Sequence, residues 1–328
     1  MPGSVTSVFS EADEFGAALL EEGYLGLLVT GPGAFRARLT QVALHRIRLS
    51  AAEEYLPRIA FVAVPHDMIL VSLANRSGPS PIWGGIETLA GDMITFGPGE
   101  RVHTRTEGPC RWTAIRMPNR DFVGYGQALS GTGFDVPPMA RWRAPPAARR
   151  ELRQLHQAAV RMAEARSRAF ADVEAVHGLE QQLIDALVDC LSAGSMGEET
   201  PTARRHRVVL TRFEDLLRAE AFAGMTEICA ALGVSERTLR ICCEEQLGMC
   251  PTEYARRGRM QLVHRALRNG NPDAASISAL ARRCGFRGIG RFATDYRALF
   301  GELPSATLRR GSGQTMARLT LHRPPRRI

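Results

Sequence analysis

The first third of the chain alternates apolar and polar residues. Segment 46–49 reads Arg-Ile-Arg-Leu, and Phe35, Ala37 and Leu39 occupy every second position. Because successive side chains of a strand point to opposite faces of a sheet, this period of two predicts strands with one buried face. Eight such runs, separated by Gly-Pro and Asn-Arg-Ser-Gly turns, predict a small β-barrel or jelly roll. The predicted strands cover 26–30, 35–44, 45–50, 58–64, 68–73, 81–85, 92–96 and 111–117.

Apolar residues change to helical spacing after Pro146. Leu152, Leu155 and Ala159 recur three and four residues apart, and leucine recurs at every fourth position of the segment 179–191. This spacing puts the apolar residues on one face and predicts two amphipathic helices. Their apolar faces would pack either on the β-rich region or on the same helices of a second chain, and spacing does not distinguish these arrangements.

The last third of the chain contains one pattern twice. Each copy has a short apolar helix, a glycine-apolar turn, a second helix and then Gly-x-x-Pro, and the copies cover 225–247 and 276–300. In the first copy Gly233 stands at the tight turn and Ser235 at the position of a helix N-cap. Gly285 takes the turn position of the second copy. The pattern predicts two helix-turn-helix units in tandem.

The second helix of each unit has an inward and an outward face. Helical spacing turns Leu239, Cys243 and Leu247 inward in the first unit, and Phe292, Tyr296 and Phe300 inward in the second. Arginines are left on the outward faces. For one unit alone, a helical bundle with a solvated arginine face would be the favoured interpretation, but two matched units favour DNA binding. A long helix from Pro251 to about Asn269 is predicted to join the units.

A set of ordered residues extends across both units. It comprises Gly233-Val234-Ser235, Arg237-Thr238-Leu239, Gly248, Pro251, Tyr254, Arg259-Met260, Ala279, Ala281, Gly285-Phe286, Phe292, Phe300-Gly301 and Pro304-Ser305. This set resembles the DNA-binding domain of AraC/XylS-type transcription regulators. Residues 285–305 are also similar to a subgroup that includes ethanolamine-operon regulators. The chain departs from the family at Cys243, where phenylalanine is usual, at Gly258 inside the linking helix, and at Gly288 and Gly290 around Ile289.

The resemblance implies roles for residues of the two second helices. Base edges would be read by Arg237, Arg240, Ile241, Ile289, Gly290, Arg291 and Thr294. Arginine can donate two hydrogen bonds to guanine, whereas isoleucine can only contact thymine methyls. Phosphates would be contacted by Ser235, Thr238, Arg256, Arg257, Arg287 and Arg297. The resemblance also implies RNA polymerase as a partner, activation rather than repression, and a cupin-like N-terminal barrel that binds an effector or a second copy of the chain.

The positive charge is concentrated in the last part of the chain. Residues 201–328 hold 23 arginines and 11 acidic residues, whereas residues 1–144 hold 13 arginines and 14 acidic residues. A basic domain beside a near-neutral one is typical of a nucleic-acid binder with a separate sensing domain. The chain has no lysine. Because a GC-rich genome would favour arginine codons, we do not count this as evidence for DNA binding.

Cysteine and histidine patterns point away from disulfides, metals and catalysis. The seven cysteines form no Cys-x-x-Cys pair. The segment 96–103, Phe-Gly-Pro-Gly-Glu-Arg-Val-His, resembles half of a cupin metal motif, but His103 lacks a second nearby histidine, and His45 and His66 are isolated. We therefore expect a protein that binds no metal and no cofactor and that is not an enzyme. The start of the chain lacks a signal sequence and no apolar run could span a bilayer, which predicts a cytoplasmic protein without membrane contact.

These observations predict an α+β multidomain protein. A β-rich barrel or jelly roll, cupin-like, would occupy 1–145, a helical connector with a flexible linker 146–200, and an all-α double helix-turn-helix domain 201–328. Trp83, Phe96 and Trp112 are candidates for an effector pocket, although ordinary core packing is the favoured interpretation of each residue taken alone. The predicted function is a sequence-specific, effector-responsive activator that binds double-stranded DNA. The alternatives are a cupin-type enzyme fused to a DNA-binding module and a regulator that oligomerises without a ligand.

Overall fold

The computed structural model describes residues 2–20, 23–74, 79, 81–131, 137–165, 170, 172–219, 224–269 and 277–310. The chain forms two compact units, Met1–Val29 with Phe35–Gly248, and Thr30–Ala34 with Met249–Ile328. The predicted boundaries after residues 145 and 200 fall inside the first unit and remain predictions. The Asn-Arg-Ser-Gly turn at 75–78 and the first residue of the second predicted helix-turn-helix unit, Ser276, lie outside the described residues.

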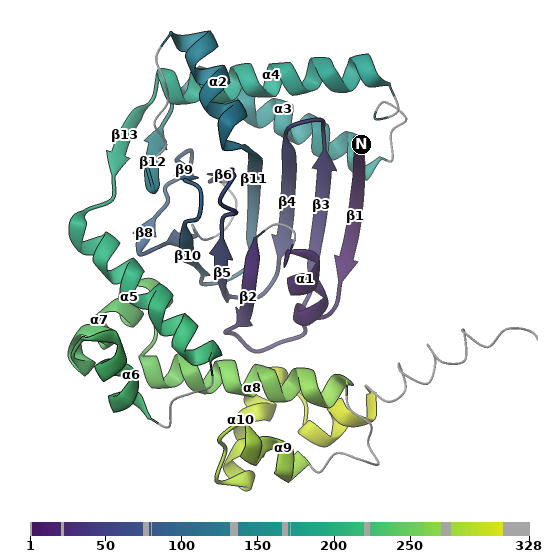
Figure 1. Ribbon diagram of the computed structural model, residues 1–328. Coiled ribbons are helices and arrows are strands. Elements are labelled where there is room, and N and C mark those ends of the chain that lie inside the picture. Colours follow the sequence, from purple (N-terminus) through teal and green to yellow (C-terminus); the bar gives the residue numbers. More distant parts are fainter. Residues whose placement is uncertain are drawn as a thin grey trace, which may run out of the picture. The chain divides into compact units, whose positions relative to one another are not determined.

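Two antiparallel sheets form the β-rich region of the first unit (Figure 1). The larger sheet has the order β1-β3-β4-β11-β6-β9-β12-β13, and the smaller one β2-β5-β10-β7-β8. Their strands are β1 (Gly3–Phe9), β2 (Tyr24–Val29), β3 (Ala37–Ala43), β4 (Arg48–Glu54), β5 (Arg58–Ala63), β6 (Met68–Leu73), β7 (Ile82–Trp83), β8 (Ile86–Glu87), β9 (Met93–Phe96), β10 (Arg101–Thr106), β11 (Cys110–Pro118), β12 (Met139–Arg143) and β13 (Ser195–Glu198). Two helices, α1 (Ala12–Ala18) and α2 (Asn119–Ser130), interrupt the strands.

The predicted barrel is not closed. Within the described residues the larger sheet ends at β1 and β13, and the smaller at β2 and β8. Alternate residues of β11 explain why the larger sheet needs two covering layers. Ile115 and Met117 enter one apolar core, and Trp112 and Ala114 enter the other. Each face is buried by a separate layer, so the apolar positions are covered without closure.

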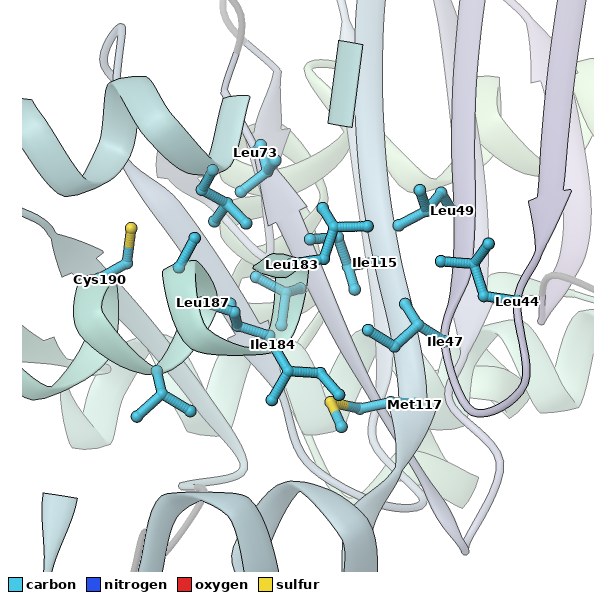
Figure 2. Packing of buried hydrophobic residues seen from close by; sticks show 14 of the residues in the cluster. Leu44, Ile47, Leu49, Leu73, Ile115, Met117, Leu183, Ile184, Leu187 and Cys190 are labelled. Atoms are coloured by element: carbon cyan, nitrogen blue, oxygen red, sulfur yellow. The ribbon is translucent and has the colours of Figure 1, made fainter. Parts of the chain in front are cut away.

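The two predicted amphipathic helices are confirmed as α3 (Pro146–Glu164) and α4 (Val173–Ser192). Leu183 and Leu187 of α4 are buried in one core with Ile115 of β11 and with Ile47, which directly precedes β4 (Figure 2). The alternative left open by the sequence is therefore decided, because this leucine face packs on the sheet of its own chain.

The segment predicted as a flexible linker is ordered in part. Residues 195–198 form β13, whose register with β12 pairs Ala140 with Glu198. Thr200 then accepts a 3.2 Å hydrogen bond from the backbone N–H of Ala203 and caps α5 (Pro201–Arg218). The prediction failed here because backbone pairing and a side-chain cap need no apolar residues.

The remaining helices are α6 (Met225–Leu232), α7 (Glu236–Leu247), α8 (Pro251–Asn269), α9 (Ile277–Arg283) and α10 (Ile289–Phe300). Their order confirms the helical C-terminal part with helix-turn-helix units. Helix α8 has the bounds predicted for the linking helix and continues through Gly258. None of the helices in the described residues is long and apolar enough to cross a membrane.

Candidate nucleic-acid interface

The turn of the first helix-turn-helix module, α6 with α7, is set by two residues. Gly233 ends α6 with φ of 68°, a left-handed conformation that favours glycine. Two residues later, the hydroxyl oxygen of Ser235 accepts a 3.1 Å hydrogen bond from the backbone N–H of Thr238. The N-cap predicted from the sequence is confirmed, and it fixes where α7 begins.

The two faces of α7 are as the sequence predicted. Leu239, Cys243 and Leu247 are buried. Arg237 and Arg240 are exposed, and Ile241 keeps 37% of its surface exposed. An apolar side chain beside two guanidinium groups on an open helix face suits a major groove, where arginine reads guanine and isoleucine contacts thymine methyls.

Helix α5 joins this module to the smaller sheet within the first unit. Its apolar residues Val209, Leu210 and Phe213 are buried, and the helix packs on α6, α7 and β10. Arg207 of α5 is almost fully buried. It donates two hydrogen bonds of 2.9 Å to Glu199 and one of 2.5 Å to Glu100. Buried charges of this kind are tolerated only where they are paired.

A second group of charges, from α5 and β10, surrounds Phe61 of β5. The guanidinium carbons of Arg101 and Arg218 lie 4.9 and 5.4 Å from the Phe61 ring centroid. Arg101 also donates a 2.8 Å hydrogen bond to Asp215, which lowers the pKa of that carboxyl. His103 is buried in β10, stacks on Phe61 and lies 3.5 Å from a Glu214 oxygen. The fold therefore places His103 inside a strand rather than at an exposed turn.

Sequence reasoning missed this contact region. The carboxylates and arginines of α5 lie at the start of the predicted DNA-binding domain, directly after the predicted linker. Only the positive charge of that segment entered the prediction. The signal that could have found it is the spacing of Val209, Leu210 and Phe213, which marks a buried helix face next to the charges.

The second module, α9 with α10, builds its core with α8. Phe292 and Tyr296 of α10 pack with Met260 and Val263 of α8, and Phe300 is partly buried beside them. The Tyr296 hydroxyl lies 2.7 Å from Nδ1 of His264 and donates a 2.8 Å hydrogen bond to Thr307. The predicted aromatic face of this helix is confirmed.

The N-terminus of α10 differs from that of α7. Gly288 occupies the N-cap with an extended backbone and offers no side-chain cap, and the helix begins at Ile289. Gly290, Arg291 and Thr294 are exposed. Ile289 packs partly against the module core, which leaves less of it for contact with a base.

The predicted phosphate-binding residues fall into two groups. Ser235, Arg287 and Arg297 are exposed, and Thr238 is partly so. Arg256 and Arg257 instead bind the Glu253 carboxylate, and Arg256 donates a 2.6 Å hydrogen bond to Asp295 of α10. Burial alone would raise the pKa of Glu253, but these arginines lower it. Arg256 therefore links α8 to α10. The Glu253 and Asp295 carboxylates compete with a DNA phosphate for its guanidinium group.

The residues predicted for an effector pocket share one core between the sheets. Trp83, Phe96 and Trp112 are all buried in it. The Trp83 and Phe96 ring centroids are 4.9 Å apart, and Trp112 donates a 2.5 Å hydrogen bond to the buried Glu54. The indole N–H of Trp83 is buried and has no hydrogen-bond partner among the described residues.

Comparison with known proteins identifies the helical region. A family model described as a helix-turn-helix domain matches residues 228–310. The chain is 31% identical over 129 residues to XylDLEGF operon transcriptional activator 3 of Pseudomonas putida, and the matched residues make up 39% of this chain and 38% of that protein. It is 32% identical over 127 residues to activator 2 of that operon, which is 39% of this chain and 78% of that protein. It is 27% identical over 283 residues to the transcriptional activator RhaS of Klebsiella pneumoniae (strain 342), and the matched residues make up 82% of this chain and 92% of RhaS.

The matched region and the two modules define a double helix-turn-helix protein. The match covers only about a third of the length of operon activators 3 and 1, but more than three quarters of activator 2. The chain belongs to the AraC/XylS family of transcription regulators.

Proposed function

We propose that this protein binds double-stranded DNA at specific sequences and activates transcription in response to a small molecule. The observation that carries the proposal is the face of α7, where Arg237, Arg240 and Ile241 are exposed above a buried apolar face. Such a face on the second helix of a helix-turn-helix module is the geometry that enters a major groove. The excess of arginine over acidic residues in 201–328 supplies the attraction to phosphates.

The proposal assigns base reading and phosphate contact to different residues. Arg237, Arg240 and Ile241 on α7, and Ile289, Gly290, Arg291 and Thr294 on α10, contact base edges. Ser235, Thr238, Arg256, Arg257, Arg287 and Arg297 contact phosphates. The α7 set has the stronger support, because all its members are exposed and the helix start is capped.

The effector would bind in the N-terminal region beside Trp83. The buried indole N–H of Trp83 supports a ligand with a polar acceptor atom, because an unpaired buried donor is costly. Trp83→Phe replaces the indole with a smaller aromatic ring and removes the N–H donor. A small molecule that raises the melting temperature of the wild-type chain through this region should raise that of the variant less.

Further elements of the proposal rest on the family. Partners would be RNA polymerase and a second copy of the chain. The similarity of residues 285–305 to ethanolamine-operon regulators supports assignment to that subgroup.

Selection of bound sequences from a random DNA library tests the proposal. Arg240→Ala should weaken binding to the preferred site by about 1 to 3 kcal/mol and relax the preference at one or two base pairs. Arg297→Ala should weaken binding to all sequences alike and lower the slope of log affinity against log salt by about one.

Arg161→Ala is the matched control, because it removes one exposed arginine from α3, outside both modules. Its sequence preference and salt slope should equal those of the wild type. If Arg240→Ala selects the wild-type sequence with unchanged affinity, α7 is not the reading helix.

A further inference from the structure

Two histidines and a buried glutamate come together at one end of the first unit. His45 lies in the turn between β3 and β4, and His177 and Glu180 lie one turn apart on α4. Each offers one ligand atom, and the three atoms lie within 4.8 Å of one another. The sequence interpretation of His45 as isolated is therefore wrong, because the fold brings residues that are distant in sequence to one place.

The Glu180 carboxylate is held in a fixed position. Its Oε1 accepts hydrogen bonds of 2.5 and 3.0 Å from the backbone N–H groups of Arg46 and Ile47. The side chain is only 2% exposed, and within the described residues the one ionisable side chain that lies within 4.0 Å of its carboxylate oxygens is His45. A buried carboxylate needs a positive partner. Both hydrogen bonds use Oε1, and the other oxygen, Oε2, lies on the side of His45.

The spacing of the ligand atoms suits a metal better than a hydrogen bond. Oε2 of Glu180 and Nδ1 of His45 are 3.5 Å apart, which is long for a hydrogen bond. Two ligands that are each about 2.1 Å from a tetrahedral zinc ion lie roughly 3.4 Å apart. His177 is exposed on the helix surface, so its ring can rotate to complete the set.

We propose that His45, His177 and Glu180 form a binding site for a divalent transition metal, with Zn²⁺ as the preferred ion. Two imidazoles and one carboxylate are typical zinc ligands, whereas Mg²⁺ and Ca²⁺ favour oxygen alone. Three protein ligands leave a fourth position for water or another donor. The bound ion ties the β3–β4 turn to α4, beside the core that contains Leu44, Ile47 and Leu183 (Figure 2).

Titration of the full-length protein with buffered Zn²⁺ tests the site. His45→Ala and His177→Ala should each weaken zinc binding by roughly 100-fold or more, because loss of even a supporting residue costs 10- to 100-fold. Both side chains are substantially exposed, so the variants retain the fold. Zinc should raise the melting temperature of the wild type and leave that of the variants nearly unchanged.

Two further measurements separate this site from other ligands of the chain. His66→Ala removes an exposed histidine from another loop and should bind zinc as the wild type does. Glu180→Gln keeps an oxygen for the two backbone N–H groups but loses the charge, so it should remain folded with weakened zinc binding. Co²⁺ bound to the wild type should give a spectrum without the charge-transfer absorption of a cysteine thiolate.

The proposal is overturned by any of three results. These are a wild-type chain that binds no Zn²⁺ at micromolar concentration, histidine variants whose affinity and melting shift equal those of His66→Ala, and a Co²⁺ spectrum with thiolate ligation. Because none of these measurements uses DNA, their outcome is independent of the proposed function.

Discussion

The first helix-turn-helix module packs on α5 and β10 of its own unit, whereas the second builds its core with α8. Around the first, Arg207 and the charges about Phe61 join α5 to the smaller sheet. In the second, Phe292 and Tyr296 are buried against α8. Two copies of one sequence pattern thus stand in different surroundings.

This difference indicates how each module can respond to the rest of the chain. Strand β10 contacts both α5 and α7, and α5 contacts α7, within one packed unit. The second module's fold rests on its own core. We therefore infer that a signal in the β-rich region reaches the first module through β10 and α5.

The largest expected effect is the loss of the second module's own core. Phe292→Ala removes a ring that is 1% exposed and should destabilise this module by about 4 kcal/mol. Hydrogen exchange measured by mass spectrometry should show lost protection over α8–α10 and unchanged protection over α6 and α7. Leu303→Ala is the control, because Leu303 is 46% exposed. Equal loss of protection in both modules would show that they fold as one.

A somewhat smaller effect is expected where α5 meets the sheet. Arg207→Ala leaves the Glu199 and Glu100 carboxylates without their cation and should cost about 3 kcal/mol. Exchange should increase over α5, α6 and α7 and remain unchanged over α10. Arg204→Ala, at an exposed position of the same helix, should have no such effect. If exchange over α6 and α7 stays at the wild-type level, α5 does not couple the first module to the sheet.

Acid should loosen the first unit selectively. Burial lowers the pKa of His156 to about 4, below its ordinary 6.5, so the folded state resists protonation. The corresponding stability is present above about pH 6.5 and is lost as the pH falls toward 4, by about 2 kcal/mol at pH 5. Urea unfolding at pH 7 and pH 5 measures this, and His156→Gln should reduce the difference. A wild-type difference that survives in His156→Gln would assign the acid sensitivity to other groups.

Strands were predictable where apolar residues alternate. Residues 68–73 were predicted as a strand and form β6 with those bounds. Strand β10 was missed because two buried polar residues, His103 and Thr104, break its apolar pattern. Strand β12 was missed because it lies between the Pro-Pro pairs 137–138 and 145–146, which were read as breaks. Such strands depend on backbone pairing and on contacts distant in sequence, which no local pattern records.

The candidate site was predictable in its local geometry. The cap at Ser235 follows from the residue type before the helix, the inward position of Leu239 follows from helix periodicity, and both are confirmed. The pairing of Arg256 with Asp295 was not predictable, because it joins two helices whose contact is set by the module core. For the same reason, His45, His177 and Glu180 could not be recognised as neighbours.

The smallest effect concerns the two helix starts. Ser235→Ala should destabilise the first turn of α7 by about 1 kcal/mol, because the backbone N–H of Thr238 loses its acceptor. Gly288→Ser should stabilise the start of α10 by roughly 0.5 kcal/mol, since it adds a cap and reduces the freedom of the unfolded chain. The extended backbone at Gly288 and the open space around its Cα both permit a serine. Amide exchange of each first turn measures the changes. Gly288→Ala is the control that reduces chain freedom without a cap. If it protects α10 as much as Gly288→Ser does, the missing cap does not distinguish the two modules.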